Sequence, residues 1–148
     1  HPRRANVSEK QKTDPVTWVL RIAMKPPNLN DHAVNRAGGR SRAGRQALAA
    51  QAGQYRKARD GWTLLVKNAA QLASCPAATG KRRVVYVRIM GPRERSWDED
   101  NLIGGGKMVF DALKGAGVLV DDNRALCERE YQEERGPASG LRMEVSDL

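Results

Sequence analysis

The stretch from Arg82 to Met90, RRVVYVRIM, constrains the fold of this chain more than any other segment. On an extended backbone, Val85, Val87 and Ile89 fall on one face, and Val84 and Tyr86 fall on the other. A strand that is apolar on both faces belongs in the interior of a sheet. We therefore predict that this segment is a central strand.

Weaker patterns predict the elements that precede this strand. A β-branched, apolar run predicts a first strand over Val16–Met24, which ends before Pro26-Pro27 because proline cannot continue a ladder. Apolar residues at three- and four-residue spacings predict a long helix from about Arg45 to Leu72. Gly53 and Gly61 weaken this helix, and Gly61 is the candidate position for a break.

The second half of the chain predicts a further helix and several short strands. The helix should start at Asn101, which suits an N-cap, and should end near Leu113. Further strands are expected at Val118–Val120, Ala125–Gln132 and Gly140–Val145. We predict one domain over residues 15–148, preceded by a basic flexible arm at residues 1–14. Its class is α/β or α+β, with a small mixed sheet and two main helices.

The chain is cationic, and its charge is placed unevenly. It contains 26 Lys+Arg and 17 Asp+Glu, which gives a formal net charge of +9. The first 60 residues hold 13 basic and 4 acidic residues, whereas the rest of the chain holds equal numbers of each. Such a block indicates either a solvated face or a polyanionic partner. No window approaches the roughly 20 apolar residues of a membrane span, and no apolar signal segment is present, so we expect a soluble, cytosolic protein without a membrane partner.

Few side chains are available for acid–base chemistry. His1 and His32 are the only imidazoles, which excludes most mechanisms that depend on histidine. Cys75 and Cys127 are far apart and match neither a CxxC nor a zinc-ligand spacing. Proton transfer must therefore depend on carboxylates, lysine or metal-bound water.

Carboxylates gather at two places in this basic chain. Asp98 and Asp100 point to one face of an extended backbone, whereas a helix would set them about 200° apart. Asp121 and Asp122 follow an apolar run, and at most one of them should join the first pair; otherwise they form an ordinary Asp-Asp-Asn turn. Three carboxylates are enough to hold one or two Mg²⁺ ions together with water and phosphate. Beside such a cluster, a nucleic acid becomes the favoured partner for the positive charge.

The segment from Asp98 to Asp122, DEDNLIGGGKMVFDALKGAGVLVDD, resembles the signature of the RusA-type Holliday junction resolvases of bacteria and their prophages. In that family an Asp-x-Asp-Asn pair, a lysine, an Asp-Ala-Leu helix end and a closing Asp-Asp recur in this order. The segment Pro26-Pro27-Asn28-Leu29-Asn30 also resembles the family's Pro-Pro-Ser-x-Asn turn after the first strand.

The resemblance implies a RusA-like fold and an enzyme of DNA recombination and repair. Its activity would be Mg²⁺-dependent, with Mn²⁺ as a substitute, and would resolve four-way DNA junctions by paired symmetric nicks. Asp98, Asp100 and Asp122 match the family's metal-binding aspartates, and Lys107 matches its catalytic lysine. The resemblance also implies that the protein acts in the bacterial cytoplasm and that its gene belongs to a bacterium or to a phage.

Lys107 departs from the family's spacing. The lysine usually stands four residues beyond the second aspartate, whereas here Ile103-Gly104-Gly105-Gly106 widens the gap to seven. On an uninterrupted helix the two spacings differ by only about 60° around the axis, so Lys107 could still face the metal site. Three glycines resist a helix by roughly 1 kcal/mol each relative to alanine, so the helix could instead begin at Gly106. Lys107 could also be an ordinary surface lysine near Asp111.

Arginines on two segments are candidates for contacts with the DNA backbone. Arg36, Arg40, Arg42 and Arg45 lie among small residues, which predicts either a loop that orders over phosphates or plain disorder. Arg93 and Arg95 immediately precede the carboxylates. Two alternatives to a junction resolvase remain. One is a flap, fork or RNA nuclease with the same carboxylates, and the other is a non-catalytic basic DNA-binding module.

The resemblance also implies a homodimer, and paired nicks need two sites related by one symmetry axis. The tail strand near Leu141–Val145 and the long helix with Trp62 are the apolar surfaces with the largest area to bury between copies. The helical spacing of Tyr55 and Trp62 nevertheless indicates core residues rather than a platform for stacking bases.

Overall fold

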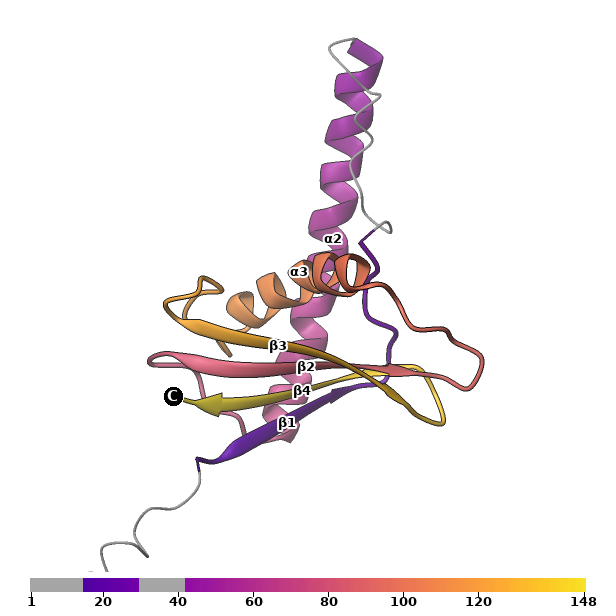
Figure 1. Ribbon diagram of the computed structural model, residues 1–148. Coiled ribbons are helices and arrows are strands. Elements are labelled where there is room, and N and C mark those ends of the chain that lie inside the picture. Colours follow the sequence, from indigo (N-terminus) through magenta and orange to yellow (C-terminus); the bar gives the residue numbers. More distant parts are fainter. Residues whose placement is uncertain (1–14, 30–41) are drawn as a thin grey trace, which may run out of the picture.

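The computed structural model describes residues 15–29 and 42–148. Its elements are β1 (Thr17–Ile22), α2 (Arg42–Leu72), β2 (Arg82–Met90), α3 (Glu99–Gly115), β3 (Cys127–Arg135) and β4 (Gly140–Asp147). The sheet has the order β1-β4-β2-β3. β2 and β3 are parallel, and the other two pairings are antiparallel. The predicted class is confirmed: a small α+β domain with a mixed sheet, two helices and RRVVYVRIM as an inner strand (Figure 1).

One face of the sheet forms the core with both helices. Figure 1 shows α2 passing behind the strands and α3 lying across α2. The buried side chains of the sheet face, of α2 and of α3 form one hydrophobic cluster, which includes Tyr86, Trp62, Val66, Phe110, Leu113, Leu141, Met143 and Val145. Of the two apolar surfaces that the sequence offered for contact between copies, Trp62 on α2 and Leu141 and Val145 on the tail strand are buried within one chain. Three leucines of α2 remain exposed: Leu64, Leu65 and Leu72. The interpretation of Trp62 as a core residue is confirmed, since it is 5% exposed.

α2 is continuous over 31 residues, about 46 Å at the α-helical rise. The expected break at Gly61 does not occur. A methyl group built at Gly53 or Gly61 would meet nothing within 4 Å, so each glycine costs only its backbone entropy. The residues of α2 that join or pack against the core begin at Tyr55. The first part of the helix projects past the sheet (Figure 1). Neither helix of the described ranges combines the length and the apolarity that crossing a membrane requires.

The expected strand at Val118–Val120 is wrong. Val118 and Leu119 are buried, but their backbone N–H groups both donate to the carbonyl of Leu113, at 3.0 and 3.3 Å. These bonds satisfy a carbonyl at the C-terminal end of α3 that would otherwise have no partner. The apolar run therefore closes the helix and fills the core, and it does not pair with the sheet.

Three consecutive glycines lie inside α3, so the alternative in which the helix begins at Gly106 is excluded. Glycine is needed at these positions because the segment that follows β1 packs directly against the helix. A methyl at Gly105 would lie 2.0 Å from the carbonyl oxygen of Pro27, and one at Gly104 would lie 2.5 Å from Cδ1 of Leu29. A methyl at Gly106 would lie 3.1 Å from the Tyr131 ring. The Pro-Pro turn is thus seated directly on the backbone of the helix that carries Lys107.

We expect Gly105→Ala to destabilise the protein by about 1–3 kcal/mol, because the added methyl overlaps backbone that cannot rotate away. The matched control is Gly53→Ala, in open space on α2, which should stabilise by roughly 0.5–1 kcal/mol. Urea denaturation followed by circular dichroism measures both. A Gly105→Ala protein as stable as the wild type would contradict this role of the glycines.

Candidate metal centre

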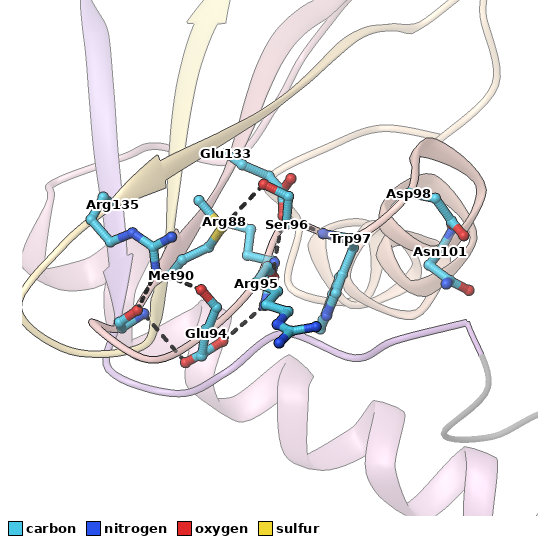
Figure 2. Close-up of polar contacts among 11 residues, drawn as sticks. Arg88, Met90, Glu94, Arg95, Ser96, Trp97, Asp98, Asn101, Glu133 and Arg135 are labelled. Carbon is cyan, nitrogen blue, oxygen red and sulfur yellow. Dashed lines mark hydrogen bonds and ion pairs between the residues drawn. The ribbon is translucent and has the colours of Figure 1, made fainter.

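A buried arginine organises the loop between β2 and α3. Arg88, on the core-facing side of β2, is 1% exposed. Its guanidinium forms ion pairs with Glu94, at 2.8 Å, and with Glu133 of β3, and it donates to the carbonyl of Arg95 at 3.1 Å. The same guanidinium lies 3.7 Å from the centre of the Trp97 ring (Figure 2). One side chain therefore contacts the loop at three of its positions.

Arg135 and Glu133, both on β3, hold the same loop from the neighbouring strand. Arg135 donates to the carbonyls of Gly91 and Glu94, each at 2.6 Å. Glu133 accepts the backbone N–H of Trp97 at 3.1 Å. Figure 2 shows these groups converging on the loop from one side. We call Arg88, Glu94, Glu133, Arg135 and Trp97 the Arg88 clamp.

Asp98 follows the Arg88 clamp and caps α3. Its backbone is extended, with φ −66° and ψ 161°, and its side chain accepts the N–H of Asn101 at 2.8 Å. The prediction that Asn101 is the N-cap was therefore wrong, because the aspartate three residues earlier takes that position. Asp100 lies in the first turn of the helix. Both carboxylates are exposed, and the positive end of the helix dipole stabilises their negative charge.

The donor set at the start of α3 fits a hard divalent cation. Magnesium is usually held in proteins by one or two carboxylates, with water and substrate phosphate at the other positions. Asp98 and Asp100 supply two such carboxylates on a helix end whose position is fixed by the Arg88 clamp. A phosphate would also be favoured here, because the first N–H groups of a helix attract anions.

Lys107 lies on the same side of α3 as Asp100. The two residues are seven positions apart, which places them within about 20° around the axis and about 10.5 Å along it. Lys107 is exposed and lines a pocket of about 180 Å³ with Asn28, Tyr55 and Met108. The Pro-Pro turn and the lysine, which the sequence treated as separate motifs, therefore meet at one pocket.

Tyr55 of α2 joins this region through Asp111. Its hydroxyl donates to the Asp111 carboxylate at 2.9 Å. Burial, followed by this hydrogen bond, raises the pKa of Tyr55 to about 12, so the phenol keeps its proton at neutral pH. Asp111 lies one turn beyond Lys107, and the bond fixes α2 against α3 at this point.

Asp121 and Asp122 lie beyond the other end of α3, in a turn. The Asn123 side chain accepts the backbone N–H groups of Ala125 and Leu126, at 3.0 and 3.1 Å. Asp121 accepts the Asp122 N–H at 2.7 Å and pairs with Lys114 at 3.4 Å. The Asp122 N–H is the main cause that lowers the pKa of Asp121.

Asp122 is held by Arg129 of β3. Arg129 donates to the Asp122 carbonyl and approaches its carboxylate to 3.8 Å. The Arg129 guanidinium also lies 4.4 Å from the Phe110 ring, and Phe110 stands ten residues beyond Asp100, about 15 Å along the helix axis. A groove of about 1050 Å³, lined by Ile103, Arg129 and Asp122 among others, follows this side of the molecule.

The structure thus places Asp98 and Asp100 at the start of α3 and Asp122 in the turn beyond the other end of the helix. Only Asp98 has the extended backbone on which the two aspartates were expected to share a face, because Asp100 already lies in the first helical turn. Within residues 15–29 and 42–148, no group of three or more His, Cys, Asp or Glu side chains could hold a metal ion. Paired ions about 4 Å apart need their ligands within a few ångströms. Within the described residues of one chain, Asp98 and Asp100 therefore lie at one end of α3, and Asp122 lies toward the other end.

The predicted DNA-contacting arginines fall into three groups. Arg36 and Arg40 lie outside the described residues. Arg42 and Arg45 are exposed in the first turn of α2, and Arg45 precedes Tyr55 by ten residues, about 15 Å of helix. The side chains of Arg93 and Arg95 are exposed on the loop that the Arg88 clamp holds.

Sequence reasoning missed Arg88 and Glu133. A signal was nevertheless present, because Arg82 and Arg88 share the alternation of Val84 and Tyr86 and must therefore face the core. A buried guanidinium needs a carboxylate partner. Glu133 is a candidate for that partner, because it continues the alternation of Cys127 and Tyr131 from a predicted strand.

A scan against protein-family models finds no match for this chain, and a search of curated proteins finds none either.

Asp98→Ala should reduce the free energy of unfolding by about 1 kcal/mol, because it removes the N-cap of α3. Asp98→Asn should stay within a few tenths of a kcal/mol of the wild type, since asparagine caps as well as aspartate. Thermal denaturation at neutral pH compares the two. Equal stability of the alanine and asparagine variants would show that the cap contributes nothing.

Proposed function

We propose that this protein is a metal-dependent, structure-selective DNA endonuclease that resolves four-way junctions in the manner of the RusA-type resolvases. The observation that carries the proposal is the position of Asp98 and Asp100. They stand exposed at the positive end of a helix, on a loop fixed by the Arg88 clamp, in a chain with a net charge of +9. Such a placement suits a site where a cation and a DNA phosphate meet.

The metal is Mg²⁺, with Mn²⁺ as a substitute, because the donors are carboxylate oxygens. When bound, such an ion polarises the scissile phosphate and makes the attacking water more acidic. Asp98 and Asp100 hold the ion, and the positive end of the α3 dipole attracts a phosphate oxygen. Lys107, on the same side of the helix, supplies positive charge to a neighbouring phosphate.

The backbone of the branched DNA is held by arginines rather than read through its bases. Arg93 and Arg95 lie on the loop beside the carboxylates, and Arg42 and Arg45 lie at the projecting end of α2. Arg36 and Arg40 belong to this set by sequence. Contacts to phosphate position the DNA without reporting its sequence, which suits recognition by shape.

In a homodimer, the carboxylates at the two ends of α3 can come from different copies and form one site. Within the described residues of one chain, Asp122 does not form a group of three carboxylates with Asp98 and Asp100. A second copy related by a two-fold axis can place its own Asp122 beside the first copy's α3. Each dimer then has two complete sites, which match the two strands cut at a junction. We expect this protein to act in the cytoplasm of a bacterial cell, where DNA is accessible. Its gene would belong to the bacterium or to a phage.

A non-catalytic basic DNA-binding module is the second candidate. The observation that favours it is the lack of a three-carboxylate group within the described chain. Such a module would bind junctions equally well with and without divalent metal and would leave them uncut. A flap, fork or RNA nuclease would use the same carboxylates, and only the substrate distinguishes it.

The wild-type protein should nick a synthetic four-way junction in Mg²⁺ and not in a chelator. Asp98→Asn, Asp100→Asn and Asp122→Asn should each abolish nicking while DNA binding is kept or strengthened, because a negative charge near phosphate is removed. Asp121→Asn is the matched control and should still nick, since Asp121 pairs with Lys114. A wild-type protein that binds the junction but never cuts it would favour the non-catalytic module.

Binding should weaken steeply with salt, because each phosphate contact releases counterions and adds about −0.9 to the log–log slope on duplex DNA. Replacing Arg40, Arg42 and Arg45 together with glutamine should flatten the slope by up to roughly three units. The matched control replaces Lys81, Arg83 and Arg142, which are already paired with carboxylates on the outer sheet face. If the first triple variant kept the wild-type slope, these arginines would not contact the DNA backbone.

A further inference from the structure

Two buried arginines stand near opposite ends of the core-facing side of β2. Arg82 and Arg88 are each 1% exposed, each is paired with a carboxylate, and each lies against a tryptophan ring. Burying a guanidinium is costly unless ion pairs and hydrogen bonds compensate for the lost water. What each arginine contacts therefore indicates which part of the fold it holds in place.

Arg82 connects segments that lie far from the candidate metal centre. It donates to Asp147 at 2.8 Å, to the carbonyl of Pro76 at 2.8 Å and to that of Val118 at 2.9 Å. These partners belong to the end of β4 and to the loops that follow α2 and α3. The contacts of Arg82 thus stabilise the opposite end of the molecule.

The partners of Arg88 lie on the loop that leads to Asp98 and on β3. Glu133 is the central group, because one of its oxygens accepts both the Arg88 guanidinium and the N–H of Trp97. The next residue after Trp97 is Asp98, whose carbonyl and carboxylate accept the N–H groups of Leu102 and Asn101. The backbone is therefore fixed immediately before and immediately after the aspartate (Figure 2).

We infer that Glu133 and Arg88 are positioning residues for the Asp98 and Asp100 ligand pair, an inference that rests on the proposed function. Glu133 does not touch the ion or the DNA. It holds the Trp97 amide and the Arg88 guanidinium, and so sets where α3 begins and where its first two carboxylates point. Groups that orient metal ligands from behind commonly change metal affinity when they are removed, by roughly 10- to 100-fold.

The experiment compares Glu133→Ala and Glu133→Gln with Asp147→Ala as the matched control. Asp147 accepts from Arg82 as Glu133 accepts from Arg88, but at the far end of β2. The first readout needs neither metal nor DNA: amide hydrogen exchange at Asn101 and Leu102, followed by NMR. Exchange at both amides should accelerate in Glu133→Ala and stay unchanged in Asp147→Ala.

The second readout is a Mn²⁺ titration of the same proteins without DNA, followed by paramagnetic broadening of the Asp98 and Asp100 amide signals. Glu133→Ala should need at least about 10-fold more Mn²⁺ for half-maximal broadening, and the Mg²⁺ requirement for nicking should rise in parallel. Glu133→Gln keeps a hydrogen-bond acceptor, so its Mn²⁺ requirement should rise by a smaller factor. This variant also provides the test if Glu133→Ala does not fold.

The inference is overturned if exchange at Asn101 keeps its wild-type rate in the folded Glu133 variants. It is also overturned if Asp147→Ala raises the Mn²⁺ requirement as much as Glu133→Ala does, because loss of stability alone would then account for the effect. A wild-type protein that binds Mn²⁺ at Asp98 but does not nick DNA would contradict the proposed function and leave the positioning test intact.

Discussion

The parallel pairing of β2 with β3 is the constraint on which the rest of this structure depends. Two parallel neighbours need a crossover, and the crossover here is α3, which must run back along the sheet between the end of one strand and the start of the next. The residues before α3 therefore lie beside the ends of β2 and β3, and the residues after it lie beside the start of β3. This topology separates the two acidic motifs, although they are close in sequence.

The charges of the second half of the chain are largely used within the fold. Lysines and arginines on or beside β2, β3 and β4 pair with carboxylates of neighbouring strands, and the pairs on the outer face include Lys81–Glu128, Arg83–Glu130 and Arg142–Glu134. The buried arginines are neutralised in the same way. The excess positive charge of the sequence belongs to the first 60 residues.

The sequence predicted the four strands of the sheet to within a few residues, but it also predicted a strand at Val118–Val120 that is absent and misplaced the start of α3. The strand at Arg82–Met90 was correct because a short segment that is apolar on both faces fits the interior of a sheet and little else. The N-cap was misplaced because Asp98 and Asn101 are equally good capping residues, and only the contacts of Trp97 decide between them. The glycines of α3 looked unfavourable for a helix, because their benefit comes from the Pro27 carbonyl, a contact 78 residues away in sequence.

We propose that the carboxylates at the two ends of α3 act at one site, built from two copies of the chain. Mixing Asp100→Asn and Asp122→Asn proteins under conditions of subunit exchange tests it, because a mixed dimer holds one intact site and one doubly altered site. We predict that the mixture nicks four-way junctions at about one quarter of the wild-type rate, since half of the dimers are mixed and each has one working site. A mixture as inactive as either variant alone, with junction binding and subunit exchange both demonstrated, would contradict the claim.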